Sequence, residues 1–159
     1  MHTNQLGNPD PANPATSRSA DAALHSVHPA SGYAGDVSPP LAYQWWHADE
    51  AVLVDIRSDA EREWVGFVPG AIPLAWRQWP GMVPNPNFDK SLLAAIPAGK
   101  KVLLLCRSGV RSMAAARRAS ELGLEAYNIL EGFEGNPDQQ AQRGHLGGWR
   151  YHGLPWRQG

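Results

Sequence analysis

The residues between Lys101 and Ser112 combine the types needed for nucleophilic chemistry on an anion. Cys106, the only cysteine in the chain, follows the apolar run 102–105 and precedes a polar loop with two arginines and a glycine. After Ser112, small and apolar residues recur at helical spacing as far as Leu122, and a glycine follows. We therefore predict a buried strand, then a tight loop, then a helix that begins at Ser112.

A thiol at the end of that strand has a favourable electrostatic setting. Main-chain N–H groups of a loop that opens into a helix create a positive potential, which stabilises a thiolate. Arg107 and Arg111 add positive charge, and a guanidinium can bind an oxyanion through two parallel hydrogen bonds. We predict that Cys106 is the catalytic nucleophile. The predicted substrate-binding residues are Arg107, Ser108, Gly109, Val110, Arg111 and Ser112.

Position alone does not give Cys106 this role. A cysteine at the end of a buried strand is commonly just a small core residue. A core cysteine, however, has no need of two arginines and a glycine in the turn that follows it. The composition of the loop therefore favours the catalytic interpretation over the structural one.

The rest of the pattern supplies the elements that must position this loop. The expected strands are 51–56, a brief strand that follows a tight turn within 68–74, and 126–130. The expected helices are 41–47, 59–64 and 89–96. Alternating strands and helices indicate a parallel sheet with helices on both faces. Ser38 and the prolines after it suit the start of the first helix. Leu92, Leu93 and Ile96 are expected to form the buried face of the last one.

Asp55 and Arg57 follow the expected strand 51–56, so they should lie at the same edge of the sheet as Cys106. We expect them to support the loop that carries Cys106 rather than to act on substrate. In this interpretation Asp55 accepts hydrogen bonds from the main chain or from an arginine, and Arg57 pairs with Glu61 or Glu63.

Two other segments are rich in residues that could border a site. Residues 76–86 contain prolines and aromatic side chains, and we expect them to cover an edge of the core, with a substrate entrance as the alternative. Residues 131–148 form a connection longer than a compact domain usually needs, so it could be mobile or functional. Beyond it, we expect Trp149 to pack in the core. His145 and His152 are expected at the surface rather than at the site.

Length and composition limit the function classes. The 159 residues suit one domain, and a net charge of −1 argues against a broad basic face for nucleic acid. A single cysteine excludes an intramolecular disulfide, and a free thiol suits a reducing cytoplasm. We expect residues 1–36, which lack the features of a secretory signal, to be a disordered tail, and residues 37–159 to be the folded domain. No stretch approaches a membrane span.

Several short motifs together resemble the rhodanese family of thiosulfate and persulfide sulfurtransferases. Residues 106–112 resemble its active-site loop, and the other similar segments, in the family's order, are 53–57, 66–71, 128–132, 147–149 and 153–155. The resemblance implies an α/β fold with a central, mostly parallel five-stranded sheet and helices on both faces. It also implies that Asp55 and Arg57 support the active loop, and that no metal or organic cofactor is required.

The resemblance further implies the reaction and its partners. Cys106 would take sulfane sulfur from an anionic donor such as thiosulfate, hold it as a persulfide, and pass it to cyanide, a small thiol or a thioredoxin-like protein. No nucleic acid or membrane partner is expected.

Three alternatives remain open. A cysteine-dependent phosphatase or arsenate reductase would have a loop one residue longer than 106–111. A non-catalytic binding module and a sulfur carrier within a pathway are the others.

Overall fold

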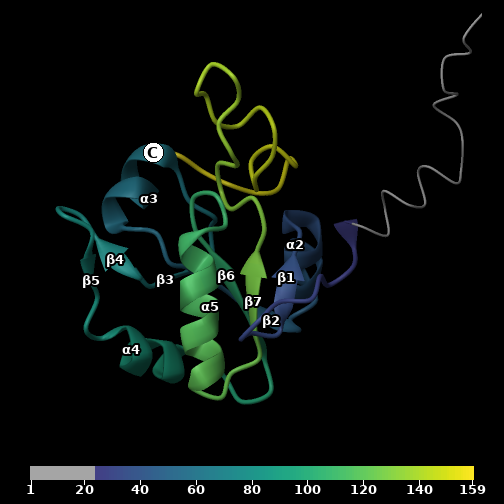
Figure 1. Cartoon of the computed structure of the whole chain (residues 1–159), viewed down its shortest axis with the longest axis vertical. Helices are drawn as coiled ribbons and strands as arrows, with labels where there is room; N and C mark the ends of the chain where they lie inside the picture. The colour runs from purple at the N-terminus through teal and green to yellow at the C-terminus, as the bar shows by residue number, and fades with distance from the viewer. Residues whose placement is uncertain (1–23) are drawn as a thin grey trace, which may run out of the picture.

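The computed structural model describes residues 24–159, which form a parallel five-stranded sheet with helices on both faces (Figure 1). The strands are β1 (Gly35–Val37), β2 (Ala51–Asp55), β3 (Ile72–Pro73), β6 (Lys101–Leu105) and β7 (Ala126–Ile129), and their order in the sheet is β1-β7-β6-β2-β3. The helices are α2 (Pro39–His47), α3 (Asp59–Val65), α4 (Phe88–Ala95) and α5 (Arg111–Glu121). The fold class expected from the sequence is confirmed.

The central strand β6 is buried on both faces, as its apolar run predicted. It pairs in parallel with β2 on one side and with β7 on the other. Its side chains alternate between two apolar clusters: Leu103 and Leu105 pack on the side of α2, whereas Leu104 packs on the side of α4 and α5. The same alternation places Cys106 on the α5 side, where α5 begins. The pleat of β6 therefore directs the thiol toward the helix start.

Local sequence explains how the helices near the site begin. Ser38 caps α2 by accepting a hydrogen bond from the Leu41 N–H at 3.2 Å. Ser58 and Glu61 form a reciprocal capping box at the start of α3. α5 begins at Arg111, one residue before the predicted start. The start of α5 has no side-chain cap, so its first main-chain N–H groups are left for other acceptors.

Two segments differ from expectation. β1 lies largely within the expected tail: residues 24–36 belong to the fold, and β1 pairs in parallel with β7. The remainder of the expected tail, residues 1–23, lies outside the described residues. Residues 76–86, for which no strand was expected, contain β4 (Arg77–Gln78) and β5 (Val83–Pro84), which form an antiparallel hairpin. Strands of two or three residues have too short a hydrophobic pattern to be recognised by periodicity. The brief strand expected within 68–74, which is confirmed as β3, was indicated by the tight turn before it.

The prediction that Leu93 belongs to the buried face of α4 is wrong. Leu93 is 48% exposed, whereas Phe88, Leu92 and Ile96 form the buried face of α4. Phe88 starts the helix one position earlier than expected and meets Trp76 edge to face, with the ring centroids 4.7 Å apart. Phe88, Leu92 and Ile96 are spaced four residues apart and so share one face, while Leu93 is turned away from it.

After β7 the chain has no further helix or strand among the described residues, and it lies above the carboxyl ends of the strands (Figure 1). Trp149 fixes this segment: its side chain is fully buried in the cluster on the α2 side, and its Nε1–H donates to the carbonyl of Pro155 at 2.8 Å. The prediction that Trp149 is a packing residue is confirmed. In the described part of the chain, no helix is long and apolar enough to cross a bilayer.

Candidate active site

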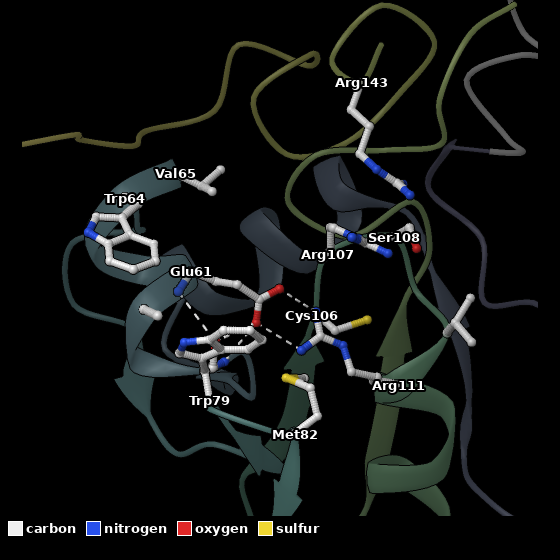
Figure 2. Close-up of a pocket in the computed structure, with 13 residues that line it drawn as sticks. Glu61, Trp64, Val65, Trp79, Met82, Cys106, Arg107, Ser108, Arg111 and Arg143 are labelled. Atoms are coloured by element: carbon white, nitrogen blue, oxygen red, sulfur yellow. Dashed lines mark hydrogen bonds and ion pairs between the residues drawn. The ribbon is translucent and has the colours of Figure 1, made fainter. Parts of the chain in front are cut away.

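A cavity of about 770 Å³ opens at the carboxyl edge of the sheet, and Cys106 lies deep within it at 1% exposure (Figure 2). Its other lining residues are Ser58, Ala60, Glu61, Trp64, Val65, Trp79, Met82, Arg107, Ser108, Val110, Arg111 and Arg143. They come from α3, the β4–β5 hairpin, the loop before α5 and the segment after β7. The cavity is therefore assembled from parts that are distant in sequence.

Main-chain donors surround the Cys106 sulfur. The N–H of Gly109 donates to Sγ at 3.1 Å and the N–H of Ser112 donates to it at 3.4 Å. Gly109 has φ +91°, a conformation that favours glycine and turns its N–H inward. The Ser112 hydroxyl lies 3.0 Å from the same sulfur. Negative charge on this sulfur would thus be stabilised by at least two amide donors, as the loop sequence predicted.

The Ser112 hydroxyl belongs to a buried polar network that the sequence did not reveal. It donates to Asn128 Oδ1, and Asn128 Nδ2 donates to Asp36 Oδ1 at 2.9 Å. The Tyr33 hydroxyl donates to the same Asp36 oxygen at 2.8 Å. Burial and the contact with Asp36 raise the pKa of Tyr33 to about 12, so its phenol stays protonated as a donor. The network ties β1, β7 and the start of α5 to the thiol.

Arg111 is bound by Glu61 across the cavity (Figure 2). Its Nη2 lies 2.6 Å from Glu61 Oε1, and its Nη1 lies 2.9 Å from Oε2. The Glu61 carboxylate therefore compensates much of the positive charge of Arg111, which was predicted from the sequence to bind the sulfur donor. The predicted pairing of Arg57 with Glu61 or Glu63 is wrong, because Arg57 binds Asp55 instead.

The Arg111–Glu61 pair makes stability depend on pH. Burial alone would raise the pKa of Glu61, but hydrogen bonds from Arg111 and Ser58 outweigh it and lower this pKa from 4.5 to about 2. Folding favours the ionised form of Glu61. The contribution of the Arg111–Glu61 pair to the free energy of unfolding is therefore complete above pH 4.5 and is lost as the pH falls toward 2.

We predict that Glu61→Gln is less stable than the wild type at neutral pH and that the difference shrinks between pH 4.5 and about 2. Urea unfolding across that range measures it. Asp59→Asn, which alters an exposed carboxylate at the start of the same helix, is the matched control. A Glu61→Gln difference that stayed constant with pH would contradict the prediction.

Asp55 and Arg57 lie behind the cavity, and neither lines it. Arg57 is fully buried: its Nε and Nη2 donate to the two Asp55 carboxylate oxygens at 3.0 and 2.7 Å, and Nη2 also donates to the Gly66 carbonyl at 2.9 Å. Its guanidinium lies 4.1 Å from the centre of the Phe133 ring. The Phe133 N–H in turn donates to the Cys106 carbonyl at 2.8 Å. The pair therefore connects to the active loop through Phe133.

Gly132 allows the segment after β7 to pack directly on the active loop. It has φ +64°, and a Cβ at this position would lie 2.5 Å from main-chain atoms of Cys106, Arg107 and Ser108. No side chain fits there without moving the loop. The motif at 128–132 thus packs directly on the loop that carries Cys106.

Two arginines supply the uncompensated positive charge at the cavity. Arg107 is exposed, and no hydrogen bond or ion pair joins its side chain to any residue within 24–159. Arg143 reaches the cavity from the 131–148 segment, and its Nη1 donates to the Gly135 carbonyl at 2.7 Å. Arg143 was not predicted; its only sequence signal is a cation in an unusually long connection. His145, Trp149 and His152 do not line the cavity.

Comparisons with known proteins agree with this architecture. A family model of the rhodanese-like domain matches residues 38–136 of the sequence. The chain belongs to the rhodanese-like domain family. The crystal structure of Rv0390 from Mycobacterium tuberculosis is 42% identical, with a TM-score of 0.73, over 80% of this chain and 99% of the other. A rhodanese-related protein of Thermoplasma volcanium has the same fold, with 20% identity and a TM-score of 0.52 over 77% of this chain and 96% of its own.

A curated relative extends the family assignment without adding a function. An uncharacterised protein of Rickettsia conorii is 33% identical over 118 residues, which is 69% of this chain and 85% of that protein. Rhodanese-like domains include sulfurtransferases, so membership makes that reaction class the first to consider. Within residues 24–159, no group of three or more histidine, cysteine, aspartate or glutamate side chains is placed to hold a metal ion.

Proposed function

We propose that this protein is a sulfurtransferase that works through a persulfide of Cys106. The observation that carries the proposal is a thiol at the base of an open cavity that receives main-chain hydrogen bonds from Gly109 and Ser112. The family assignment supports the same reaction class. A reducing compartment such as the cytoplasm would keep this thiol free.

The reaction has two half-reactions with Cys106 as the nucleophile. The Cys106 thiolate attacks the outer sulfur of thiosulfate, a new S–S bond forms, and the S–S bond of thiosulfate breaks with its electron pair leaving on sulfite. The negative charge of the resulting persulfide lies on its outer sulfur, which we expect the inward-facing amides of the loop from Arg107 to Arg111 to stabilise. An acceptor nucleophile, cyanide or a thiolate, then takes the terminal sulfur and regenerates the Cys106 thiolate. Ping-pong kinetics follow from this covalent intermediate.

The cavity supports a phosphatase or arsenate reductase less well. Arg111, at the start of α5, is held by the Glu61 carboxylate and is not free to bind a tetrahedral oxyanion, which leaves Arg107 and Arg143 as the cations at the cavity without a carboxylate partner among the described residues. Such a reaction also needs an acid near the leaving group. The described residues that line the cavity include no histidine or aspartate, and Glu61, with a pKa of about 2, is ionised at neutral pH. A non-catalytic module would not need the thiol that this cavity contains.

The deciding experiment is mass spectrometry of the intact protein after incubation with thiosulfate. We expect the mass to rise by one sulfur atom and to return to its original value after cyanide is added, with thiocyanate as the product. Hydrolysis of p-nitrophenyl phosphate in place of sulfur loading would favour the phosphatase. The absence of both reactions would favour a binding module.

The Ser112 hydroxyl should matter for the first half-reaction. In the structure it donates to Asn128, and it can turn to donate to the sulfur when the sulfur becomes anionic. We predict that Ser112→Ala slows sulfite release from thiosulfate by roughly 10- to 100-fold, because one hydrogen bond to a charged sulfur is lost. Ser112→Thr keeps the hydroxyl and should retain most of the rate. Equal rates for Ser112→Ala and the wild type would contradict a role for this hydroxyl.

A further inference from the structure

The size of the cavity does not match the substrates that define the proposed reaction. Thiosulfate and cyanide contain only a few heavy atoms. A volume near 770 Å³ instead falls within the range of about 300–1,000 Å³ typical of sites for larger organic ligands. Because the first half-reaction needs only a small anion next to Cys106, most of the cavity remains for the molecule that accepts the sulfur.

One side of the cavity is apolar and aromatic. Trp64 of α3 and Trp79 of the β4–β5 hairpin are 69% and 60% exposed, and Val65 and Met82 lie beside them (Figure 2). Large aromatic side chains that stay exposed around a concave site commonly mark a binding surface. These residues are well placed to cover a flat, apolar group that extends from the sulfur.

The aromatic side is held in place before any ligand binds. Gln78 of the hairpin donates to Asp59 Oδ2 at 2.9 Å and accepts from the Asp59 N–H at 3.1 Å, which joins the hairpin to α3. At the other end of α3, the Trp64 carbonyl accepts a hydrogen bond from Gln158. The two tryptophans are therefore carried by elements that are bonded to each other, so little ordering is needed when a ligand enters.

The opposite side of the cavity is cationic. Figure 2 shows Arg107 and Arg143 on the side away from the two tryptophans. Within the described residues neither guanidinium is paired with a carboxylate, whereas Arg111 is compensated by Glu61. A ligand that spans the cavity would place an apolar surface on one side and a negative charge on the other.

We infer that the sulfur acceptor is a small organic thiol with an aromatic body and a carboxylate, an inference that rests on the proposed function. The acceptor thiolate attacks the outer sulfur of the Cys106 persulfide. A new S–S bond forms on the acceptor, and the bond to Cys106 breaks with its electrons returning to Sγ. The products are an aromatic persulfide and the Cys106 thiolate, with no change in the total charge.

The test measures the second half-reaction from protein already loaded with thiosulfate and freed of excess donor. The acceptors are para-mercaptomethylbenzoate, benzyl thiol, which lacks the carboxylate, and mercaptopropionate, which lacks the ring. Loss of the added sulfur, followed by mass spectrometry, gives a rate constant for each. We expect para-mercaptomethylbenzoate to react at least about tenfold faster than either of the others.

Variants separate the two sides of the cavity. Trp64→Ala and Trp79→Ala should reduce the preference for para-mercaptomethylbenzoate over mercaptopropionate. Arg143→Gln should reduce the preference for para-mercaptomethylbenzoate over benzyl thiol. Leu93→Ala is the matched control, because it truncates an exposed apolar side chain on α4 outside the cavity, and both preferences should stay unchanged.

The outcomes distinguish this inference from the proposed function. Failure to load sulfur from thiosulfate would overturn the proposed function and the inference together. A protein that loads sulfur but discharges it to all three thiols at similar rates would overturn the inference alone. Discharge to the thiol of a thioredoxin-like protein at least about tenfold faster than to para-mercaptomethylbenzoate would also overturn it, because the aromatic surface would then serve a protein partner.

Discussion

Replacing Cys106 with serine is expected to abolish sulfur loading while leaving the protein folded. A serine hydroxyl is close to the thiol in size and can accept the Gly109 N–H that now binds Sγ. It is far less nucleophilic at neutral pH, so we expect thiocyanate formation from thiosulfate and cyanide to fall by at least about a thousandfold. Intact-protein mass spectrometry should show no added sulfur.

The control for Cys106→Ser is a measurement of the thermal stability of this variant. Because the hydroxyl can use the same donors, we expect its melting temperature to stay within about 4 °C of the wild type. Residual transfer comparable to the wild type would contradict the assignment of Cys106 as nucleophile. If Cys106→Ser lost both activity and folding, the persulfide would be tested instead by Ser112→Ala and by the mass shift of the wild type.

Replacing Asp55 with asparagine is expected to be the most destabilising change near the site. Asparagine preserves the volume, but its amide group faces the Arg57 donors and leaves a fully buried guanidinium without a counter-charge. Breaking a buried ion pair in this way costs about 3–5 kcal/mol. Urea or thermal unfolding at neutral pH measures the loss.

The matched control for Asp55→Asn is Asp89→Asn. Asp89 pairs with Arg118 at 2.6 Å, which is as short as the buried pair, but the two side chains are 43% and 40% exposed. Water and salt screen such a pair, so we expect a loss much smaller than that of Asp55→Asn. Equal losses in the two variants would show that burial of the Asp55–Arg57 pair does not determine its contribution.

The same buried pair should affect activity through the main chain. Arg57 packs on Phe133, and the Phe133 N–H binds the carbonyl of Cys106. If Asp55→Asn remains folded, we expect slower sulfur loading even though Asp55 does not line the cavity. A positioning role of this kind predicts a lower kcat with little change in the KM for thiosulfate, since no substrate contact is removed.

The sequence by itself determined the unit that carries the thiol. An apolar run, a polar turn with a glycine and a helical repeat predicted β6, the loop and α5 within one residue, because each of these signals lies within a few positions of the element that it specifies. The sequence motifs also identified the family, which the comparisons confirm. The short strand β1 and the β4–β5 hairpin were missed because two or three residues carry too little periodicity.

Only the tertiary structure decided what surrounds the thiol. Glu61 binds Arg111 from 50 positions away, and Asp36 reaches Asn128 across 92. Both contacts depend on the strand order β1-β7-β6-β2-β3, which places β1 beside β7 and β2 beside β6. Hydrophobic periodicity specifies which face of a strand is buried, but it does not specify which strand lies beside it. The partners of Cys106 and the walls of its cavity therefore follow from packing, whereas the nucleophile and its loop follow from local sequence.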